Sequence, residues 1–291
     1  MIIVVGIDAL EYDLVNKWRL ENLLLENNKK ISTPEDIYLH TKILWPTIIT
    51  GKHPRDHGIQ EGDIGSWENT ILEKSSNILD KILPESIKRF LSIFLRKIGF
   101  EHSSRDKDYY KEKNIETIFS GLRTKAIDVP QYNETGISDE IKNKMDRSFS
   151  DFNEAEKFIN KCKEEFEIKS KELINSLNEP IDLVMCYFYS LDGLQHVFHS
   201  DEEFLKEWYK KFDELIGTIK EEASDEDEII VVSDHGIKNG KHTDYAFFSS
   251  YKEELKVESI LDVKKEIQEI TKKNRKNHEE IKEELNNLGY I

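Results

Sequence analysis

The sequence predicts an α/β fold: a three-layer α/β/α sandwich with helices on both faces of a mostly parallel central sheet, and a helical cap inserted into it. Two observations predict this class. Short apolar runs rich in β-branched residues alternate with long amphipathic segments, the order typical of a parallel sheet with crossover helices. Acidic and imidazole side chains closely follow three of these runs, and in such sheets ligands bind beyond the carboxyl ends of the strands.

Four short segments, three of them apolar runs, are predicted to be strands. The first is a continuous β-branched run closed by Gly6 and Asp8, as expected for a strand buried on both faces. The second is short and stops at Pro130, the third follows Pro180, and the fourth leads into Ser233. In chain order the predicted strands span residues 2–7, 125–129, 181–187 and 229–232.

The helix predictions depend on apolar residues that recur at spacings of three and four. This pattern is strong in two charged segments and continues in the C-terminal tail. Residues 41–63 are predicted to be irregular because proline and glycine interrupt them, and 105–116 to be a polar loop. The predicted helical segments span residues 70–100 with a break at Pro84, 150–177, 202–222 and 252–288.

The negative net charge of the chain argues against some classes of binding partner. The 291 residues carry a formal net charge of −16, so we expect no duplex nucleic acid as the main partner, because little would neutralise its phosphates. An anionic substrate would also be repelled at long range and needs local positive charge at its site. Bound metal ions are one source of that charge.

Cysteine content and the chain start bear on the compartment. Cys186 lies in an apolar run and is predicted to be a core residue, and with Cys162 as the only other cysteine no disulfide framework is indicated. The first residues show no basic region or cleavage site of a secretory signal. No run approaches the ~18 apolar residues of a membrane-spanning helix. We expect a soluble, cytoplasmic protein.

Six carboxylate and imidazole side chains are predicted to meet at one edge of the sheet. Asp192 and His196 are four residues apart and share a face of a helical turn. This donor set suits zinc, manganese or iron better than calcium, and six ligands are enough for two ions. The set consists of Asp8, Asp192, His196, Asp234, His235 and His242. Structural roles are expected for the histidines at positions 40, 53, 102, 199 and 278.

Four blocks of sequence, in this order, resemble the alkaline phosphatase superfamily and most closely its type I phosphodiesterase/nucleotide pyrophosphatase branch. The second block contains a Thr-Gly pair followed by Pro-x-x-His-Gly-Ile, and the third an Asp-x-x-x-His pair. The fourth contains Ser-Asp-His-Gly and a later histidine. The blocks are residues 4–8, 41–59, 190–196 and 233–242, and the likeness extends over nearly the whole chain.

The resemblance implies a nucleophile and a ligand set. The nucleophilic threonine of the family stands nine residues before the threonine of the Thr-Gly pair, which gives Thr41 rather than Thr47. The resemblance also implies two divalent ions, Zn²⁺ first and Mn²⁺ as the alternative, and a covalent phospho-Thr41 intermediate. One ion would be held by Asp8, Thr41, Asp234 and His235, and the other by Asp192, His196 and His242.

Several residues near the predicted nucleophile have two interpretations each. Lys42 either contacts a phosphoryl oxygen or points to solvent, and Trp45 either lines the leaving-group pocket or packs in the core. Thr47 is expected to stabilise its loop and is the reserve nucleophile. His57 and Gly58 are expected to fix the same loop.

One departure from the family concerns the substrate. The position of an asparagine that binds a phosphoryl oxygen in the family's nucleotide pyrophosphatases falls on Gly62, between Glu61 and Asp63, so specificity for nucleotides is in question. The leading prediction is a two-metal phosphodiesterase acting on a small phosphate ester. The alternatives are a phosphomonoesterase or phosphotransferase on the same scaffold, and a metal-binding module without turnover.

The domain prediction is a single catalytic domain over 1–291 with a cap or lid insert at 63–116. Within the insert, residues 87–100 combine four basic residues with apolar residues at helical spacing and contain no acidic residue. Such a helix packs on the core or in an interface between subunits, or it lies on a lipid surface. The packed helix is favoured, membrane contact is the alternative, and a homo-oligomer is left open.

Overall fold

The computed structural model describes residues 1–61, 106–148 and 152–287. Its centre is a six-stranded sheet in the order β2-β8-β5-β1-β4-β3. β1 pairs in parallel with β4 and β5, β3 pairs in parallel with β4, and β8 is antiparallel to both its neighbours. The strands are β1 (Ile2–Ile7), β2 (Asn27–Ser32), β3 (Thr124–Ile127), β4 (Leu183–Phe188), β5 (Glu228–Val232) and β8 (Tyr245–Ser250). The predicted mostly parallel sheet and its four predicted strands are confirmed.

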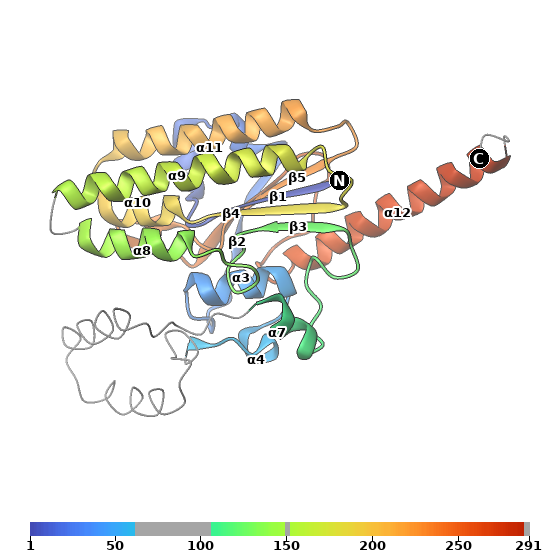
Figure 1. Cartoon of the computed structure of the whole chain (residues 1–291), viewed down its shortest axis with the longest axis horizontal. Coiled ribbons are helices and arrows are strands. Elements are labelled where there is room, and N and C mark those ends of the chain that lie inside the picture. The colour runs from blue at the N-terminus through green and yellow to red at the C-terminus, as the bar shows by residue number, and fades with distance from the viewer. Residues whose placement is uncertain (62–105, 149–151, 288–291) are drawn as a thin grey trace.

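Helices cover both faces of this sheet (Figure 1). One face carries α8 (Ile137–Ser148), α9 (Phe152–Ser176), α10 (Ser190–Phe198) and α11 (Glu202–Glu222). The other face carries α3 (Thr41–Thr50) and the start of α12 (Val263–Asn287), whose second half extends away from the body. The short helices are α1 (Tyr12–Trp18), α2 (Glu21–Leu24), α4 (Pro54–His57) and α7 (Lys107–Glu112).

The alternation of side chains along β4 joins the two helical layers to the sheet. The ring of Tyr187 meets Trp45 of α3 edge to face, with centroids 5.1 Å apart. The next residue, Phe188, points to the opposite face and packs on Phe212 of α11 with centroids 5.4 Å apart. On the Trp45 side β1 contributes Gly6, where any Cβ would collide with the indole. The buried aromatic residues therefore fix α3 closely against the ends of β1 and β4.

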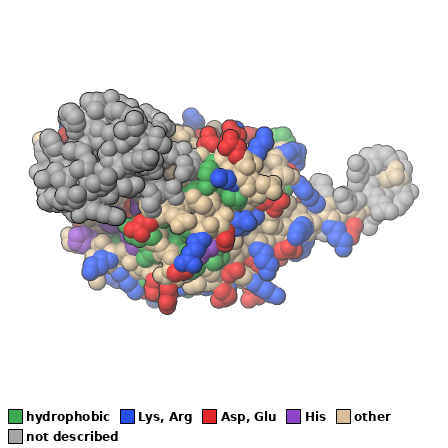
Figure 2. Space-filling model, turned by 90° about the horizontal axis from the view of Figure 1, so that it is seen from below, with side chains coloured by type: hydrophobic (Ala, Val, Ile, Leu, Met, Phe, Trp, Pro, Cys, Tyr) green, Lys and Arg blue, Asp and Glu red, His purple; other side chains and the backbone are tan. Residues whose placement is uncertain are grey.

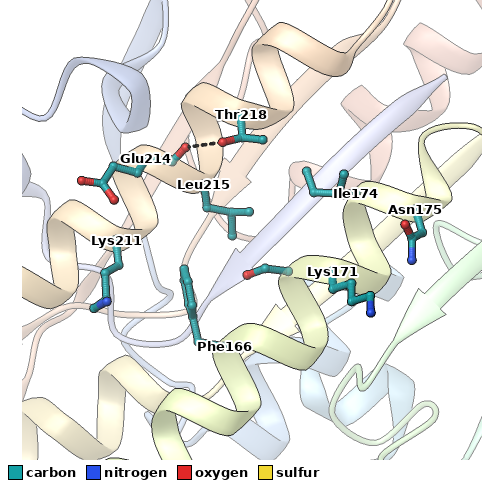
Figure 3. A pocket seen from close by; sticks show the side chains of 9 residues that line it. Phe166, Lys171, Ile174, Asn175, Lys211, Glu214, Leu215 and Thr218 are labelled. Atoms are coloured by element: carbon teal, nitrogen blue, oxygen red, sulfur yellow. Dashed lines mark hydrogen bonds between the residues drawn. The ribbon is translucent and has the colours of Figure 1, made fainter.

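A hollow of about 390 Å³ lies between α9 and α11, two of the helices that cover one face of the sheet (Figure 3). Phe166, Ile174 and Leu215 form its apolar part, and Lys171 and Lys211 stand at its rim. None of its lining residues is a predicted site residue. On the described part of the face seen from below, basic and acidic side chains are interspersed (Figure 2).

The structure differs from the sequence predictions in several segments. Residues 41–63 were expected to be irregular, yet α3 and α4 lie there, and α7 lies in the predicted loop 105–116. The C-terminal helix begins at Val263, so residues 252–262 are not helical. β2, β8 and the short hairpin of β6 (Ile237–Lys238) and β7 (Lys241–His242) were not predicted.

Two sequence predictions fall mainly outside the described residues. The predicted helical segment 70–100, with its basic stretch 87–100, lies there, as does the predicted cap apart from its last residues 106–116. The cap and the lipid contact therefore stay predictions. In the part of the chain that the structure describes, no helix is both long and apolar enough to cross a membrane.

Candidate metal centre and nucleophile

Three neighbouring strands deliver the predicted ligands to one edge of the sheet. β1 ends at Asp8, whose backbone N–H donates to the carbonyl of Phe188 at the end of β4 over 2.9 Å. β4 leads into α10, which carries Asp192 and His196 one turn apart. β5 leads directly into Asp234 and His235. Since these strands are parallel, their carboxyl ends bring the ligands together.

The first group of ligands is fully buried. Atoms of Asp8, Asp234 and His235 lie within 4.8 Å of one another. Nε2 of His235 lies 3.5 Å from Oδ1 of Asp8 and 3.4 Å from Oδ2 of Asp234. Two carboxylates and one imidazole thus face a common point.

The second group lies beside the first and is more open. It consists of Asp192, His196 and His242, whose candidate ligand atoms also lie within 4.8 Å of one another. Nε2 of His196 is 3.3 Å from Oδ1 of Asp192 and 3.1 Å from Nε2 of His242. The rings of His242 and His235 stack with centroids 3.9 Å apart, so the two groups are adjacent. The division into two groups is the one that the family resemblance implies.

The donor atoms of both groups fit divalent cations. Among the described residues, four buried atoms in the two groups have no hydrogen-bond partner: Oδ1 of Asp8, Oδ1 of Asp192, Oδ2 of Asp234 and Nε2 of His235. Buried polar atoms are nearly always paired, so four such atoms at one place fit the coordination of divalent cations. Nδ1 of His235 and Nδ1 of His242 lie 3.2 Å from the carbonyls of Gly236 and Leu39, which leaves each Nε2 facing the site.

The acid–base properties of the site reflect closely spaced carboxylates away from water. Burial and the charge of Asp192 raise the pKa of Asp8 to about 7, and burial and the charge of Asp8 raise the pKa of Asp234 well above its usual value. Burial also raises the pKa of Asp192, but the neighbouring imidazoles outweigh it and bring that pKa down to about 2. Burial lowers the pKa of His235, which favours the neutral imidazole that binds metals.

Thr41 lies at the first ligand group. It is the first residue of α3, and the side chain of His40 accepts a hydrogen bond from the backbone N–H of Lys42 at the start of this helix. The Thr41 hydroxyl donates to Oδ2 of Asp8 over 3.1 Å. Because Trp45 and most of α3 are buried, the position of this hydroxyl is set by core packing.

The other residues near Thr41 have different surroundings. Trp45 is fully buried between β1 and β4, so its packing role is supported and a place in the leaving-group pocket is not. Thr47 is also fully buried, donates to the carbonyl of Ile43 and lies 3.1 Å from Nε2 of His57. The side chain of Lys42 lies 3.9 Å from a carboxylate oxygen of Glu134, and its contact with substrate stays a proposal.

A family model for type I phosphodiesterase/nucleotide pyrophosphatase matches residues 2–290. The chain belongs to this family. No curated protein matches the sequence significantly. Among solved structures, murine ectonucleotide pyrophosphatase/phosphodiesterase 5 is 17% identical, with 81% of this chain and 57% of the murine chain covered and a TM-score of 0.43. An inactive form of that protein in complex with AMP gives a TM-score of 0.41 at 17% identity, with 81% and 56% covered.

The PH0037 protein from Pyrococcus horikoshii is 10% identical, with 93% of this chain and 97% of that chain covered and a TM-score of 0.49. The present chain therefore spans little more than half the length of the murine relative and nearly all of the archaeal one. Membership of the phosphodiesterase family follows from the family model, which covers almost the whole chain.

A buried ion-pair cluster behind the family ligands was not found from the sequence. Lys169 of α9 donates to Glu165 over 2.7 Å and to the carbonyl of Tyr187 over 2.8 Å, and it pairs with Asp128 at 2.5 Å. Glu165 accepts the backbone N–H groups of Tyr189 and Ser190, at the start of α10. The cluster thus holds the helix of Asp192 and His196 in place. The only available signal was Glu165 and Lys169 four residues apart, a spacing common on solvated helix faces.

Proposed function

We propose that the chain hydrolyses phosphodiesters with the help of two divalent cations and with Thr41 as nucleophile. The observation that supports this best is the juxtaposition of two ligand groups with four unpartnered buried atoms and the Thr41 hydroxyl beside them. The family to which the chain belongs contains phosphodiesterases and nucleotide pyrophosphatases, which agrees with this chemistry.

The first step of the proposed reaction is a displacement at phosphorus. The Oγ1 atom of Thr41 gives up its proton to solvent and forms a bond to phosphorus, while the bond from phosphorus to the leaving oxygen breaks and that oxygen takes up a proton, which gives phospho-Thr41. Water then attacks phosphorus, releases the phosphorylated product and restores the threonine. Asp8 orients the attacking hydroxyl through the 3.1 Å hydrogen bond.

The cations would be held by Asp8, Thr41, Asp234 and His235 on one side and by Asp192, His196 and His242 on the other. When bound, such ions favour the alkoxide form of a threonine and balance charge on the phosphoryl oxygens. The mixed carboxylate and imidazole donors favour Zn²⁺, with Mn²⁺ as the alternative. A small phosphate ester is the proposed substrate.

A paired rate assay tests the proposal. Protein freed of metal is reloaded with Zn²⁺ or Mn²⁺ and given bis-p-nitrophenyl phosphate, p-nitrophenyl phosphate and a nucleotide diester side by side. Faster cleavage of the diesters, lost on chelation and in Thr41→Ala, is the expected result. A preference for the monoester would assign the chain to phosphomonoesterases, and stoichiometric metal without turnover of any ester would leave a metal-binding module.

A further inference from the structure

Lys142 of α8 lies over Tyr189, the residue that directly precedes the helix of Asp192 and His196. Its Nζ stands 4.6 Å from the centroid of the Tyr189 ring. One turn later on α8, the sulfur of Met145 accepts a hydrogen bond from the Tyr189 hydroxyl over 3.9 Å. Through these two contacts α8 packs against the side chain of Tyr189. The carbonyl of Tyr189 in turn accepts the backbone N–H of Asp192, a candidate ligand.

The position of α8 is fixed by the buried cluster described above. Asp128, which pairs with Lys169, also accepts hydrogen bonds from the hydroxyls of Thr135 and Ser138. Ser138 is in the first turn of α8, so the start of this helix is tied to the same cluster that holds α10. Lys142, one turn further along, is therefore carried by a rigid element.

The positive charge of Lys142 influences two groups of the candidate site, the Asp8 carboxyl and the imidazole of His40. Burial raises the pKa of Asp8, and the Lys142 ammonium opposes that rise. Burial lowers the pKa of His40 to about 3, and repulsion by Lys142 is the next contribution. His40 directly precedes Thr41. The positive charge of Lys142 thus acts on the Asp8 carboxyl and on the imidazole that precedes Thr41.

The surroundings of Lys142 leave its charge available. Within the described ranges, no carboxylate oxygen lies within 4.0 Å of its Nζ, although the chain has a net charge of −16. Its contact is instead the face of the Tyr189 ring, and an ammonium group in such a contact still has N–H donors for an acceptor. A half-buried cation over Tyr189, with no acidic partner among the residues that the structure describes, fits an anion that binds there.

We propose that Lys142 donates a hydrogen bond to a non-bridging oxygen of the substrate phosphoryl group at the metal edge. The proposal rests on the proposed phosphodiesterase function and adds the group that binds the phosphoryl anion. It also accounts for the sequence departure at Gly62, because an ammonium donor takes the part for which that position offers no amide. Lys142 contributes by binding and by charge, and it neither accepts nor releases a proton in the reaction.

The test uses Lys142→Ala, Lys142→Arg and the matched control Lys144→Ala, which removes the same charge from the same helix. The zinc-loaded proteins are titrated with inorganic phosphate by calorimetry, and kcat and KM are measured with bis-p-nitrophenyl phosphate. Zinc affinity and Tm are measured in parallel. Lys142→Ala should weaken phosphate binding by about 10- to 100-fold, the size expected for one charged hydrogen bond. Lys142→Arg should restore most of the affinity, and Lys144→Ala should match the wild type.

Unchanged phosphate affinity in Lys142→Ala would overturn the proposal, as would a parallel loss of zinc affinity or Tm, since a structural role would then explain the effect. Phosphate binding that depends on Lys142 in a protein without ester turnover would support the Lys142 site and refute the phosphodiesterase. Turnover that persists unchanged in Lys142→Ala would refute only the Lys142 site.

Discussion

The hydroxyl of Thr41 donates a hydrogen bond to Oδ2 of Asp8 across 3.1 Å, and this contact joins the start of α3 to the end of β1. The same Oδ2 accepts the hydroxyl of Tyr187 at 2.5 Å, while Oδ1 has no partner among the described residues. One carboxylate therefore orients the proposed nucleophile with one oxygen and leaves the other free for a cation.

Thr41 and Thr47 of α3 should respond in opposite ways to loss of their hydroxyls. Thr41→Ala should lower kcat/KM for a diester by at least about 10³-fold with little change in Tm, because it removes the nucleophile. Thr47→Val should keep turnover but lose about 1–3 kcal/mol of stability, because it leaves the buried His57 without its partner. Steady-state rates and urea unfolding check both. Loss of turnover in Thr47→Val alone would assign the nucleophile to Thr47.

The two ligand groups should lose metal independently. Asp234→Asn removes a carboxylate from the first group and Asp192→Asn from the second. Each variant should retain one tightly bound ion and bind the other more than about 100-fold more weakly, because even outer-shell partners contribute 10- to 100-fold. Metal content after dialysis, measured by mass spectrometry, checks the stoichiometry. Two ions retained in either variant would contradict the proposed ligand sets.

The buried lysine of α9 should be essential for stability. Lys169→Met leaves Glu165 and Asp128 without their cation in the core, which should cost about 3–5 kcal/mol. Lys171→Met, at an exposed position on the same helix, should change stability by less than about 0.5 kcal/mol. Urea unfolding of both variants makes the comparison. Equal stabilities would show that the cluster does not hold the helices together.

Acid should destabilise the fold through His57. Burial lowers the pKa of His57 to about 4 from a usual 6.5, so between these values the unfolded chain takes up a proton that the folded chain cannot. Stability from this residue is complete above pH 6.5 and falls as the pH drops toward 4, by about 3 kcal/mol at 1.36 kcal/mol per pH unit. His57→Gln should flatten that part of the profile. Urea unfolding at pH 7.5, 6 and 4.5 checks this, and parallel profiles would exclude His57 as the source.

Three of the four strands that the sequence predicted share one property, a run of mostly apolar residues buried on both faces. β1 and β4 have six buried residues each and β5 has five, so composition alone identifies them. β2 has the sequence NNKKIS, with Ile31 as its only buried residue. Its strand conformation comes from pairing with β8, which no local pattern records.

The helix of the proposed nucleophile was missed for a different reason. Pro46 and several β-branched residues weaken the local preference for helix in α3, yet nine of its ten residues are buried. Tertiary burial overrides the local preference there. The motif of Asp234 and His235 shows the converse, because Gly236 follows them where a Cβ would collide with the carboxylate of Glu11. The sequence shows that glycine, but the contact that requires it is visible only in the fold.

The pairing of β1 sets the order of events during synthesis. Val5 of β1 pairs with Cys186 of β4 on one side and with Val231 of β5 on the other. The pairing of β1 can therefore be completed only after both β4 and β5 have been synthesised. The ligands run from Asp8 to His242, and at 5–20 residues per second a ribosome needs roughly 10–50 s to cover that distance. Neither cation site can be completed before its last ligand leaves the ribosome. On the proposed ligand sets, metal loading follows the synthesis of His242, so the proposed cations would act in the activation of the chain rather than at the start of its folding.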